Sequence, residues 1–271
     1  MKQGSALVTG NWQGTAAGGV TDPDLIILPD PETRFATTAA RLAALAPGHR
    51  LEDWLSFMAR LASAQWKSLD AVSDLEPLSL SVVDAAADAA MPPLAIERHA
   101  RAPVWRTALS RILDSMEEGP LPAATCEVIA ALRAADIESV EALADRFLRG
   151  VLQAEDAGGA IHVAAALQVY FTKLAAALPV DGLRLLPQRG LCPCCGSTPT
   201  AGVITASGKT PGTRYLHCSL CATAWTHLRA TCITCGDTRT VALQGIEGSS
   251  DLVKAETCDA CGTYSKTIYQ K

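Results

Sequence analysis

Four Cys-x-x-Cys pairs near the end of the chain are the residues whose type and spacing can do chemistry. They are Cys192 with Cys195, Cys218 with Cys221, Cys232 with Cys235, and Cys258 with Cys261. A gap of 22 residues separates the first pair from the second and also the third from the fourth, and the whole unit repeats after 40 residues. Two such pairs, each at the tip of a hairpin, can place four thiolates at the corners of a tetrahedron around one metal ion. The repeat therefore predicts two metal ions per chain, each with four cysteine ligands.

The repeat also assigns the ligands to the two sites. The first site takes Cys192, Cys195, Cys218 and Cys221, and the second takes Cys232, Cys235, Cys258 and Cys261. Glycine follows the second cysteine in three of the four pairs, as a tight turn with positive φ prefers. Cys194 lies inside the first pair, but the Cys-x-x-Cys-Gly register favours Cys195, so we expect Cys194 to be spare. Cys126 lies on an apolar helical segment and is expected to be a small core residue.

Other uses of the cysteines have less support. The N-terminus carries no apolar export signal, which favours a cytoplasmic protein in which disulfides are rare. No βαβ pattern surrounds a pair, as a thioredoxin-like role requires. A tetrahedral site of four thiolates accepts either zinc or iron, so zinc-ribbon and rubredoxin-like modules both remain open. In either case a closed four-cysteine site is most often structural.

Composition and charge narrow the class of protein. Hydrophobic residues make up 49% of the 271 residues and charged residues 19%, which is typical of a globular chain. The most apolar stretch, 163–180, is interrupted by Gln168, Thr172 and Lys173, so we expect no membrane insertion. The net charge is -5, divided as -8 over residues 1–188 and +3 over residues 189–271. Two divalent ions with eight thiolates would bring the second part to -1, so no basic stripe for nucleic acid is expected.

The elements that position the cysteines differ along the chain. Apolar residues recur at three and four residue steps through the first 180 residues, which predicts an all-helical bundle of six to eight helices. The expected helices span 31–46, 51–69, 80–90, 94–116, 121–134, 138–149 and 152–178, with Pro103 and the Gly158-Gly159 pair as kinks or breaks. Asp30 is expected to cap the first helix, with Pro31 at its first position.

The second expected helix carries a periodic apolar stripe that predicts core positions. The stripe consists of Trp54, Leu55, Met58, Leu61, Ala62 and Trp66. Beyond about residue 186 the helix-forming residues give way to Gly, Thr and Cys, and runs such as 202–205 and 214–217 predict hairpin strands. The predicted fold is a multi-domain chain, with an N-terminal all-α helical bundle followed by two small rubredoxin-like or zinc-ribbon β modules. We expect a flexible arm over 1–27, the helical domain over 28–185, and ribbons over 186–230 and 231–271.

The remaining residues suggest no catalytic machinery. The five histidines form no metal-binding or triad motif, and no nucleophile-elbow or phosphate-binding glycine loop is present. His217 precedes Cys218 directly, yet an ordinary strand residue is the simpler interpretation. We therefore expect no catalytic residues and a protein that is not an enzyme.

Several long motifs resemble the FdhE family, whose members are accessory proteins for the formation of active respiratory formate dehydrogenases. In the ribbon half they are 192–197 (CPCCGS), 214–225 (RYLHCSLCATAW), Arg229, 232–236 (CITCG) and 255–266 (AETCDACGTYSK). The helical half is similar through 29–31 (PDP), Phe35, 41–42, 48–49 and 51–65, so the resemblance covers about 28–271. This chain departs from the family pattern at Cys194, where a non-thiol residue is common, and at Thr226, which separates Trp225 from His227.

The resemblance implies a cytoplasmic, non-enzymatic protein. Its partner would be the catalytic subunit of a molybdenum- or tungsten-containing formate dehydrogenase, bound before export. It also implies a helical domain followed by two rubredoxin-like ribbons, with iron as the favoured metal. Whether the chain forms a homodimer stays open.

The sequence and the resemblance leave three candidate functions to be tested. The first is a metal-binding maturation factor for formate dehydrogenase. The second is a rubredoxin-like one-electron carrier, in which a change between ferric and ferrous iron needs no new ligands. The third, with the least support, is a nucleic-acid-binding zinc ribbon.

Overall fold

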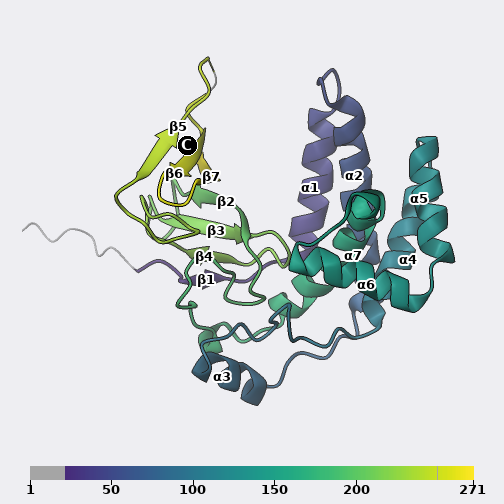
Figure 1. Ribbon diagram of the computed structural model, residues 1–271, viewed down its shortest axis with the longest axis horizontal. Helices are drawn as coiled ribbons and strands as arrows, with labels where there is room; N and C mark the ends of the chain where they lie inside the picture. Colours follow the sequence, from purple (N-terminus) through teal and green to yellow (C-terminus); the bar gives the residue numbers. More distant parts are fainter. Residues whose placement is uncertain (1–21, 249) are drawn as a thin grey trace, which may run out of the picture.

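The computed structural model describes residues 22–248 and 250–271. Helices occupy one side of the molecule and a single twisted sheet the other, with the short helix α3 beneath the junction (Figure 1). The described residues contain seven α-helices, and all of them precede the last six strands. The predicted order of a helical bundle followed by small β modules is confirmed. No described helix combines the length and the apolar character needed to cross a membrane.

All the helices except α3 surround α7, which is the buried centre of the helical part. Their bounds are α1 Pro31–Leu45, α2 Glu52–Lys67, α3 Leu80–Asp88, α4 Val104–Glu117, α5 Ala123–Ala134, α6 Ile137–Arg149 and α7 Ala157–Ala176, with 3₁₀ turns at Ser68–Val72, Ala154–Asp156 and Val180–Gly182. Helix α7 is apolar around most of its circumference, which is the pattern of a helix covered on all sides. Asp30 caps α1 as predicted, since its carboxylate accepts the Glu32 N–H at 3.1 Å, and Pro31 is the first helical residue.

The apolar stripe predicted on α2 is wrong at its two tryptophans. Trp54 and Trp66 are 48% and 46% exposed, and the buried face of α2 instead consists mainly of small residues around Leu61. Trp66 lies at the surface because its indole N–H donates to the Glu32 carboxylate at 2.7 Å. Small residues on the inner face let α1 and α7 approach α2 closely, and the bulky rings remain outside.

Two helix boundaries also differ from prediction. Residues 94–103, expected to be helical, form turns, and Pro103 directly precedes α4. Gly158 and Gly159 lie inside α7 and do not break it. A Cβ at Gly158 would lie 2.7 Å from Val128 Cγ2, and one at Gly159 would lie 3.1 Å from Leu143 Cδ2. These glycines therefore permit the close approach of α5 and α6 to α7.

Cys126 is exposed, so the prediction of a core cysteine is wrong. Helix α5 lies at the edge of the bundle, where it buries only Ile129 fully. An apolar composition therefore does not place each of its residues inside.

The strands of both ribbons belong to one seven-stranded sheet in the order β1-β4-β3-β2-β7-β6-β5. Their bounds are β1 Ile26–Ile27, β2 Pro199–Ile204, β3 Arg214–Cys218, β4 Ala224–Thr226, β5 Val241–Gln244, β6 Val253–Cys258 and β7 Thr263–Tyr269. Neighbouring strands are antiparallel except β2 and β7, which pair in parallel and join the first ribbon to the second.

The end of the predicted N-terminal arm is structured. Strand β1 pairs with β4, with Ile26 opposite Trp225, and the Tyr215 hydroxyl donates to the Asp24 carbonyl at 3.0 Å. Residues 24–27 therefore complete the edge of the first ribbon. The rest of the arm, residues 1–21, lies outside the described residues.

Candidate metal centres

The four cysteines predicted for the first site converge at the tips of two turns. Their sulfur atoms all lie within 4.8 Å of one another. The Sγ atoms of Cys192 and Cys221 are 3.5 Å apart, as are those of Cys195 and Cys218. A disulfide would need about 2 Å, whereas four sulfurs at about 2.3 Å from a central ion are about 3.8 Å apart. The group is therefore shaped to hold one metal ion.

The second group of four has the same arrangement. Its sulfurs also lie within 4.8 Å of one another. Cys232 Sγ is 3.7 Å from Cys261 Sγ, and Cys235 Sγ is 3.6 Å from Cys258 Sγ. The pairing of first with fourth and second with third cysteine repeats that of the first group, so the second group can hold an ion in the same way.

The turns that carry the cysteines have the predicted backbone. Gly196, Gly236 and Gly262 have φ of 81°, 77° and 68°. In the remaining turn Ala222 takes this place with a φ of 62°, at a cost that glycine avoids. Within the turn at Cys218, the backbone N–H groups of Leu220 and Cys221 each lie 3.4 Å from the Cys218 sulfur. Such N–H groups stabilise a thiolate, so the turn prepares its cysteine for an ion.

The thiols within each group influence one another's ionisation. Burial works to raise the pKa of Cys218, but hydrogen bonds from its neighbouring thiols and from the Cys221 N–H prevail and hold that pKa well below the usual value. Burial raises the pKa of Cys192 well above it. One thiolate is thus favoured while a second is opposed. Binding an ion to all four sulfurs must therefore displace protons.

In the second group, too, one cysteine has a lowered pKa and another a raised pKa. Desolvation opposes ionisation of Cys232, but the backbone N–H groups of Cys235 and Thr234 lower its pKa to about 6. The Asp237 N–H works to lower the pKa of Cys235, but desolvation and the thiols of Cys261 and Cys232 outweigh it and raise that pKa to about 12. Metal binding here also depends on proton release.

The helical part holds the first site from outside through hydrogen bonds to its two turns. The N–H groups of Leu94 and Ile96 donate to the carbonyls of Cys194 and Cys195 at 2.9 and 3.1 Å. From α7, the Gln168 amide donates to the Ser219 carbonyl at 3.0 Å. Residues 94–96 leave the helical pattern, and the N–H groups of Leu94 and Ile96 bond to this turn instead. The first ribbon is thus bonded directly to the helical part.

Arg34 brings a positive charge from α1 to the first site. Its guanidinium donates to the Leu220 carbonyl at 3.0 Å and also to the Thr172 hydroxyl. Burial lowers the pKa of Arg34, while the nearby sulfurs of Cys221, Cys218 and Cys195 act in the opposite direction. Four thiolates and a divalent ion carry two negative charges, so the half-buried guanidinium offsets part of the charge of a loaded site.

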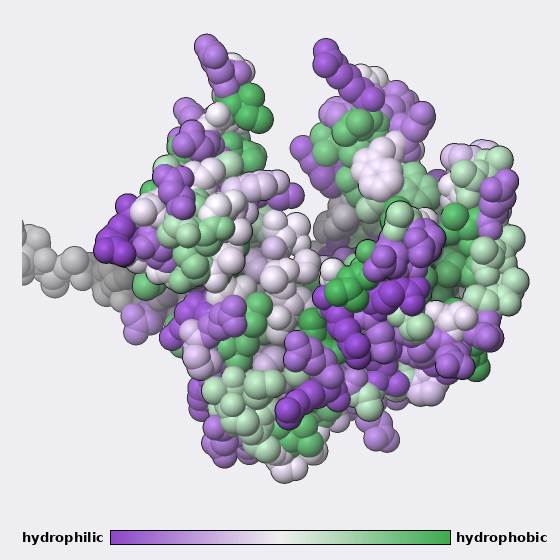
Figure 2. All heavy atoms as spheres, in the orientation of Figure 1, coloured by the Kyte–Doolittle hydropathy of each residue, from purple (hydrophilic) through white to green (hydrophobic). Residues whose placement is uncertain are grey.

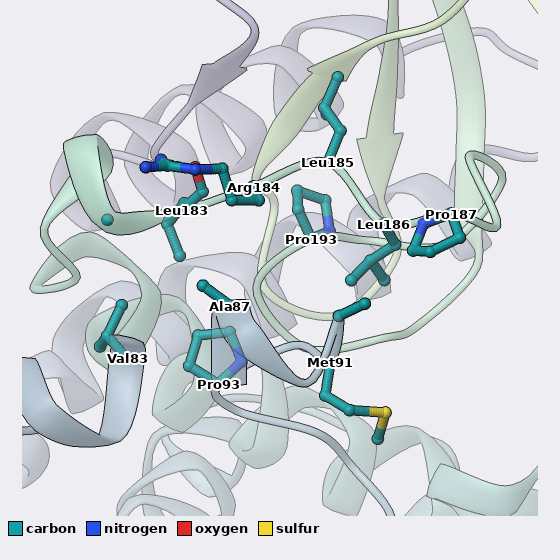
Figure 3. Close-up of a pocket in the computed structure, with 12 residues that line it drawn as sticks. Val83, Ala87, Met91, Pro93, Leu183, Arg184, Leu185, Leu186, Pro187 and Pro193 are labelled. Atoms are coloured by element: carbon teal, nitrogen blue, oxygen red, sulfur yellow. The ribbon is translucent and has the colours of Figure 1, made fainter. Parts of the chain in front are cut away.

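A small cavity of about 120 Å³ marks the junction between the helical part and the first ribbon. Figure 3 shows Pro193, from the first cysteine turn, across the cavity from Ala87 and Pro93, with Leu183 and Leu186 on its other sides. The lining is mostly apolar. The contact between the two parts therefore combines apolar packing with the hydrogen bonds to the cysteine turns.

The second ribbon packs mainly against the first ribbon and not against the helices. Arg214 and Glu256, 1% and 7% exposed, form an ion pair at 2.8 Å between β3 and β6. A Cβ on Gly190 would lie 1.8 Å from the Ile233 carbonyl oxygen, so the backbones touch there. Figure 2 shows the lobe of β5 to β7 separated by a gap from the lobe of α1 and α2. All four cysteines are buried in the first group, whereas Cys235 is exposed and Cys261 half-buried in the second.

Two further residues that the sequence singled out, Cys194 and His217, belong to neither group of four cysteines. Cys194 is fully buried, outside both groups of four sulfurs. His217 is an exposed residue of β3. Arg34, Leu94 and Gln168 were not identified from the sequence, because each lies far from the cysteines along the chain and belongs to no motif.

Comparisons with known proteins agree over nearly the whole chain. Family models for the FdhE N-terminal region, the FdhE central domain and the FdhE C-terminal domain match residues 23–186, 191–229 and 230–271. A protein FdhE homolog of Rhizobium meliloti is 34% identical, covering 93% of this chain and 83% of the relative. One of Edwardsiella ictaluri is 36% identical, with 91% and 79% covered.

A solved structure is also similar. The crystal structure of the FdhE protein from Pseudomonas aeruginosa matches with a TM-score of 0.77 at 31% identity, covering 90% of this chain and 85% of that one. Because all three family models match in order and relatives align over most of their own length, this chain belongs to the FdhE family.

Proposed function

We propose that this chain is a non-catalytic accessory protein that assists the formation of active formate dehydrogenase. The observation that carries the proposal is a pair of four-cysteine groups, one clamped by the helical part and one exposed, in a chain of the FdhE family. Its partner would be the catalytic subunit of a molybdenum- or tungsten-containing enzyme, met in the cytoplasm before export. A chain with this arrangement can use one site for its own fold and present the other to a partner.

The eight cysteines would each bind metal. Cys192, Cys195, Cys218 and Cys221 would hold the first ion, and Cys232, Cys235, Cys258 and Cys261 the second. The donor set of four sulfurs fits iron or zinc. An ion at either site would supply a fixed tetrahedral crosslink, and iron would add a one-electron couple. A ferric site is coloured and bleaches on reduction, whereas a zinc site is colourless, so absorbance with metal analysis decides the metal.

Co-purification from the native cytoplasm tests the accessory role. We expect the intact protein to retain a formate dehydrogenase catalytic subunit, identified by mass, and Cys232→Ala/Cys235→Ala to lose it. Cys194→Ala is the matched control, since it removes a buried thiol outside the two groups and should keep two ions per chain and the partner. If neither the intact protein nor the control retains the subunit, the proposal is wrong.

The exposure of Cys235 supports a second candidate, a rubredoxin-like one-electron carrier, because an exposed thiolate gives an electron a short route to a partner. This candidate requires iron at the second site and rapid, reversible turnover with a reductase. A protein that holds only zinc in the cell would eliminate it.

A further inference from the structure

A groove of about 860 Å³ runs along the junction of the two ribbons and ends at the second cysteine group. Its walls come from four segments, namely the approach to β1, residues 185–190, residues 212–214 at the start of β3, and the loop from β4 to the third cysteine pair. The lining residues used below are Leu25, Arg189, Arg214, His227, Leu228 and Arg229. No part of the established family match assigns a role to this groove.

The part of the groove away from the second cysteine group is positively charged. Three arginines line it, and none of its lining residues is acidic. Arg214 is committed to the fold, because its guanidinium binds Glu256 and the carbonyls of Leu228 and Thr231. Arg189 and Arg229 are exposed, and neither forms an ion pair within residues 22–248 and 250–271. Two unneutralised guanidinium groups therefore face the same groove.

Two further observations relate these charges to residues that line the groove. An Arg229 guanidinium nitrogen would lie 3.8 Å from a Cβ at Gly212, so this side chain lies against a lining residue. Burial lowers the pKa of His227, its hydrogen bond with the Leu228 carbonyl acts in the opposite direction, and the nearby charges of Arg214 and Arg189 lower the pKa further. Arg189 thus lies near His227 and Arg229 lies near Gly212, and both of these neighbours line the groove.

Exposed apolar side chains also line the groove, together with these arginines. Leu228 is 76% exposed and Leu25 is 59% exposed, and both line the groove. Exposed leucines beside unpaired arginines are typical of a surface that a partner covers. An extended peptide with alternating acidic and apolar side chains has the charge and the shape that complement this surface.

Other occupants fit less well. Residues 1–21 precede Pro23, which lines the groove, but their sequence contains no aspartate or glutamate to pair with the arginines. A nucleic acid strand would meet the positive charge, yet no phenylalanine, tyrosine or tryptophan lines the groove to stack on bases.

We propose that this groove binds an extended acidic segment of the partner protein, with carboxylates at Arg189 and Arg229 and apolar side chains on Leu25 and Leu228. The inference deepens the proposed function, on which it rests only for the identity of the partner. It adds the surface and the chemistry of the segment that is recognised.

Peptide binding tests the groove directly. The full-length, metal-loaded protein is titrated against a fluorescent octapeptide of alternating glutamate and leucine, with binding followed by anisotropy. We expect binding that weakens with salt, and a loss of affinity of at least about tenfold in Arg189→Glu/Arg229→Glu. Arg41→Glu/Arg111→Glu makes the same change in net charge at exposed helical positions and should leave the affinity within about twofold of wild type. Each variant should still hold two ions per chain.

Several results would overturn the proposal. They are no binding of the peptide by wild type, equal weakening in both double variants, binding only after residues 1–21 are removed, and tighter binding of a single-stranded oligonucleotide that depends on Arg189 and Arg229. An octapeptide of alternating lysine and leucine should not bind.

Co-purification separates this inference from the accessory role. We expect wild type and Arg41→Glu/Arg111→Glu to retain the formate dehydrogenase catalytic subunit and Arg189→Glu/Arg229→Glu to lose it. Retention of the catalytic subunit by all three proteins would overturn the proposal that the groove binds the partner, and would leave the accessory role intact. Loss from wild type as well would refute the accessory role, and the peptide titration would then decide the groove alone.

Discussion

The two four-cysteine groups share their spacing, turn geometry and sulfur pairing, yet their surroundings differ. In the first group all four cysteines are buried, and the helical part contacts both turns. In the second group Cys235 is exposed and the module stands away from α1 and α2 (Figure 1). The local sequence therefore builds the same site twice, and the helical part makes only one of them part of the core. We infer that the first site maintains the fold and the second serves the partner.

The largest expected effect comes from removing the ligands of one site at a time. Cys218→Ala/Cys221→Ala should lose one ion and destabilise the helical part, because the turn that meets Arg34 and Gln168 loses its crosslink. Structural sites of this kind contribute on the order of 10 kcal/mol to the folding of a small module. Cys258→Ala/Cys261→Ala should lose one ion and leave the helical part unchanged. Metal analysis and thermal unfolding followed by circular dichroism check both double variants. Equal destabilisation of the helices by the two variants would contradict the proposed difference between the sites.

Gly190→Ala should separate the two ribbons. The new Cβ would lie 1.8 Å from the Ile233 carbonyl oxygen, so one backbone must move, at a cost of about 3 kcal/mol. Hydrogen exchange of the β2 and β7 amides should quicken while the first site keeps its ion. Gly245→Ala is the control, since a Cβ there meets nothing within 4 Å. Unchanged exchange in Gly190→Ala would show that this contact does not hold the ribbons together.

Arg34→Met should weaken metal binding at the first site alone. The change removes a half-buried positive charge and a hydrogen bond to the Leu220 carbonyl, which together are worth about 2 kcal/mol. Chelator competition should show the lower affinity at the first site with no change at the second. Arg41→Met, at an exposed position of the same helix, serves as the control. If both sites weaken equally, Arg34 does not act on the first site specifically.

Ala222→Gly should give the smallest effect, a gain of up to about 1 kcal/mol. Ala222 has a φ of 62° in the position that glycine occupies in the other three turns, and glycine relieves that strain. Thermal unfolding should show a modest rise for Ala222→Gly, whereas Gly236→Ala at the equivalent turn of the second ribbon should destabilise that ribbon. A fall in stability of Ala222→Gly would mean that the strain is compensated elsewhere.

The sequence predicted what is encoded locally. The spacing of the cysteine pairs predicted the two groups, and the glycines after them predicted turns with positive φ. The cap at Asp30 was likewise predicted from adjacent residues. These features depend on residues a few positions apart, whose geometry follows from the backbone alone.

Features that depend on distant residues could not be predicted. Trp66 was assigned to the core because periodicity does not show which face of a helix its neighbours cover. The turns at 94–103 look helical in sequence, but the N–H groups of Leu94 and Ile96 donate to the first cysteine turn, about 100 residues away. The parallel pairing of β2 with β7, which joins the ribbons into one sheet, has no signal in either strand.

The most direct test of the difference between the sites is the time course of metal release from wild-type protein with two bound zinc ions, in excess chromogenic chelator. We predict two phases of one ion each, separated by at least about tenfold in rate, because exposed sites open more readily than sites inside the core. The fast phase should be missing in Cys258→Ala/Cys261→Ala and present in Cys218→Ala/Cys221→Ala. A single phase in wild type, or a fast phase that survives removal of Cys258 and Cys261, would contradict the account.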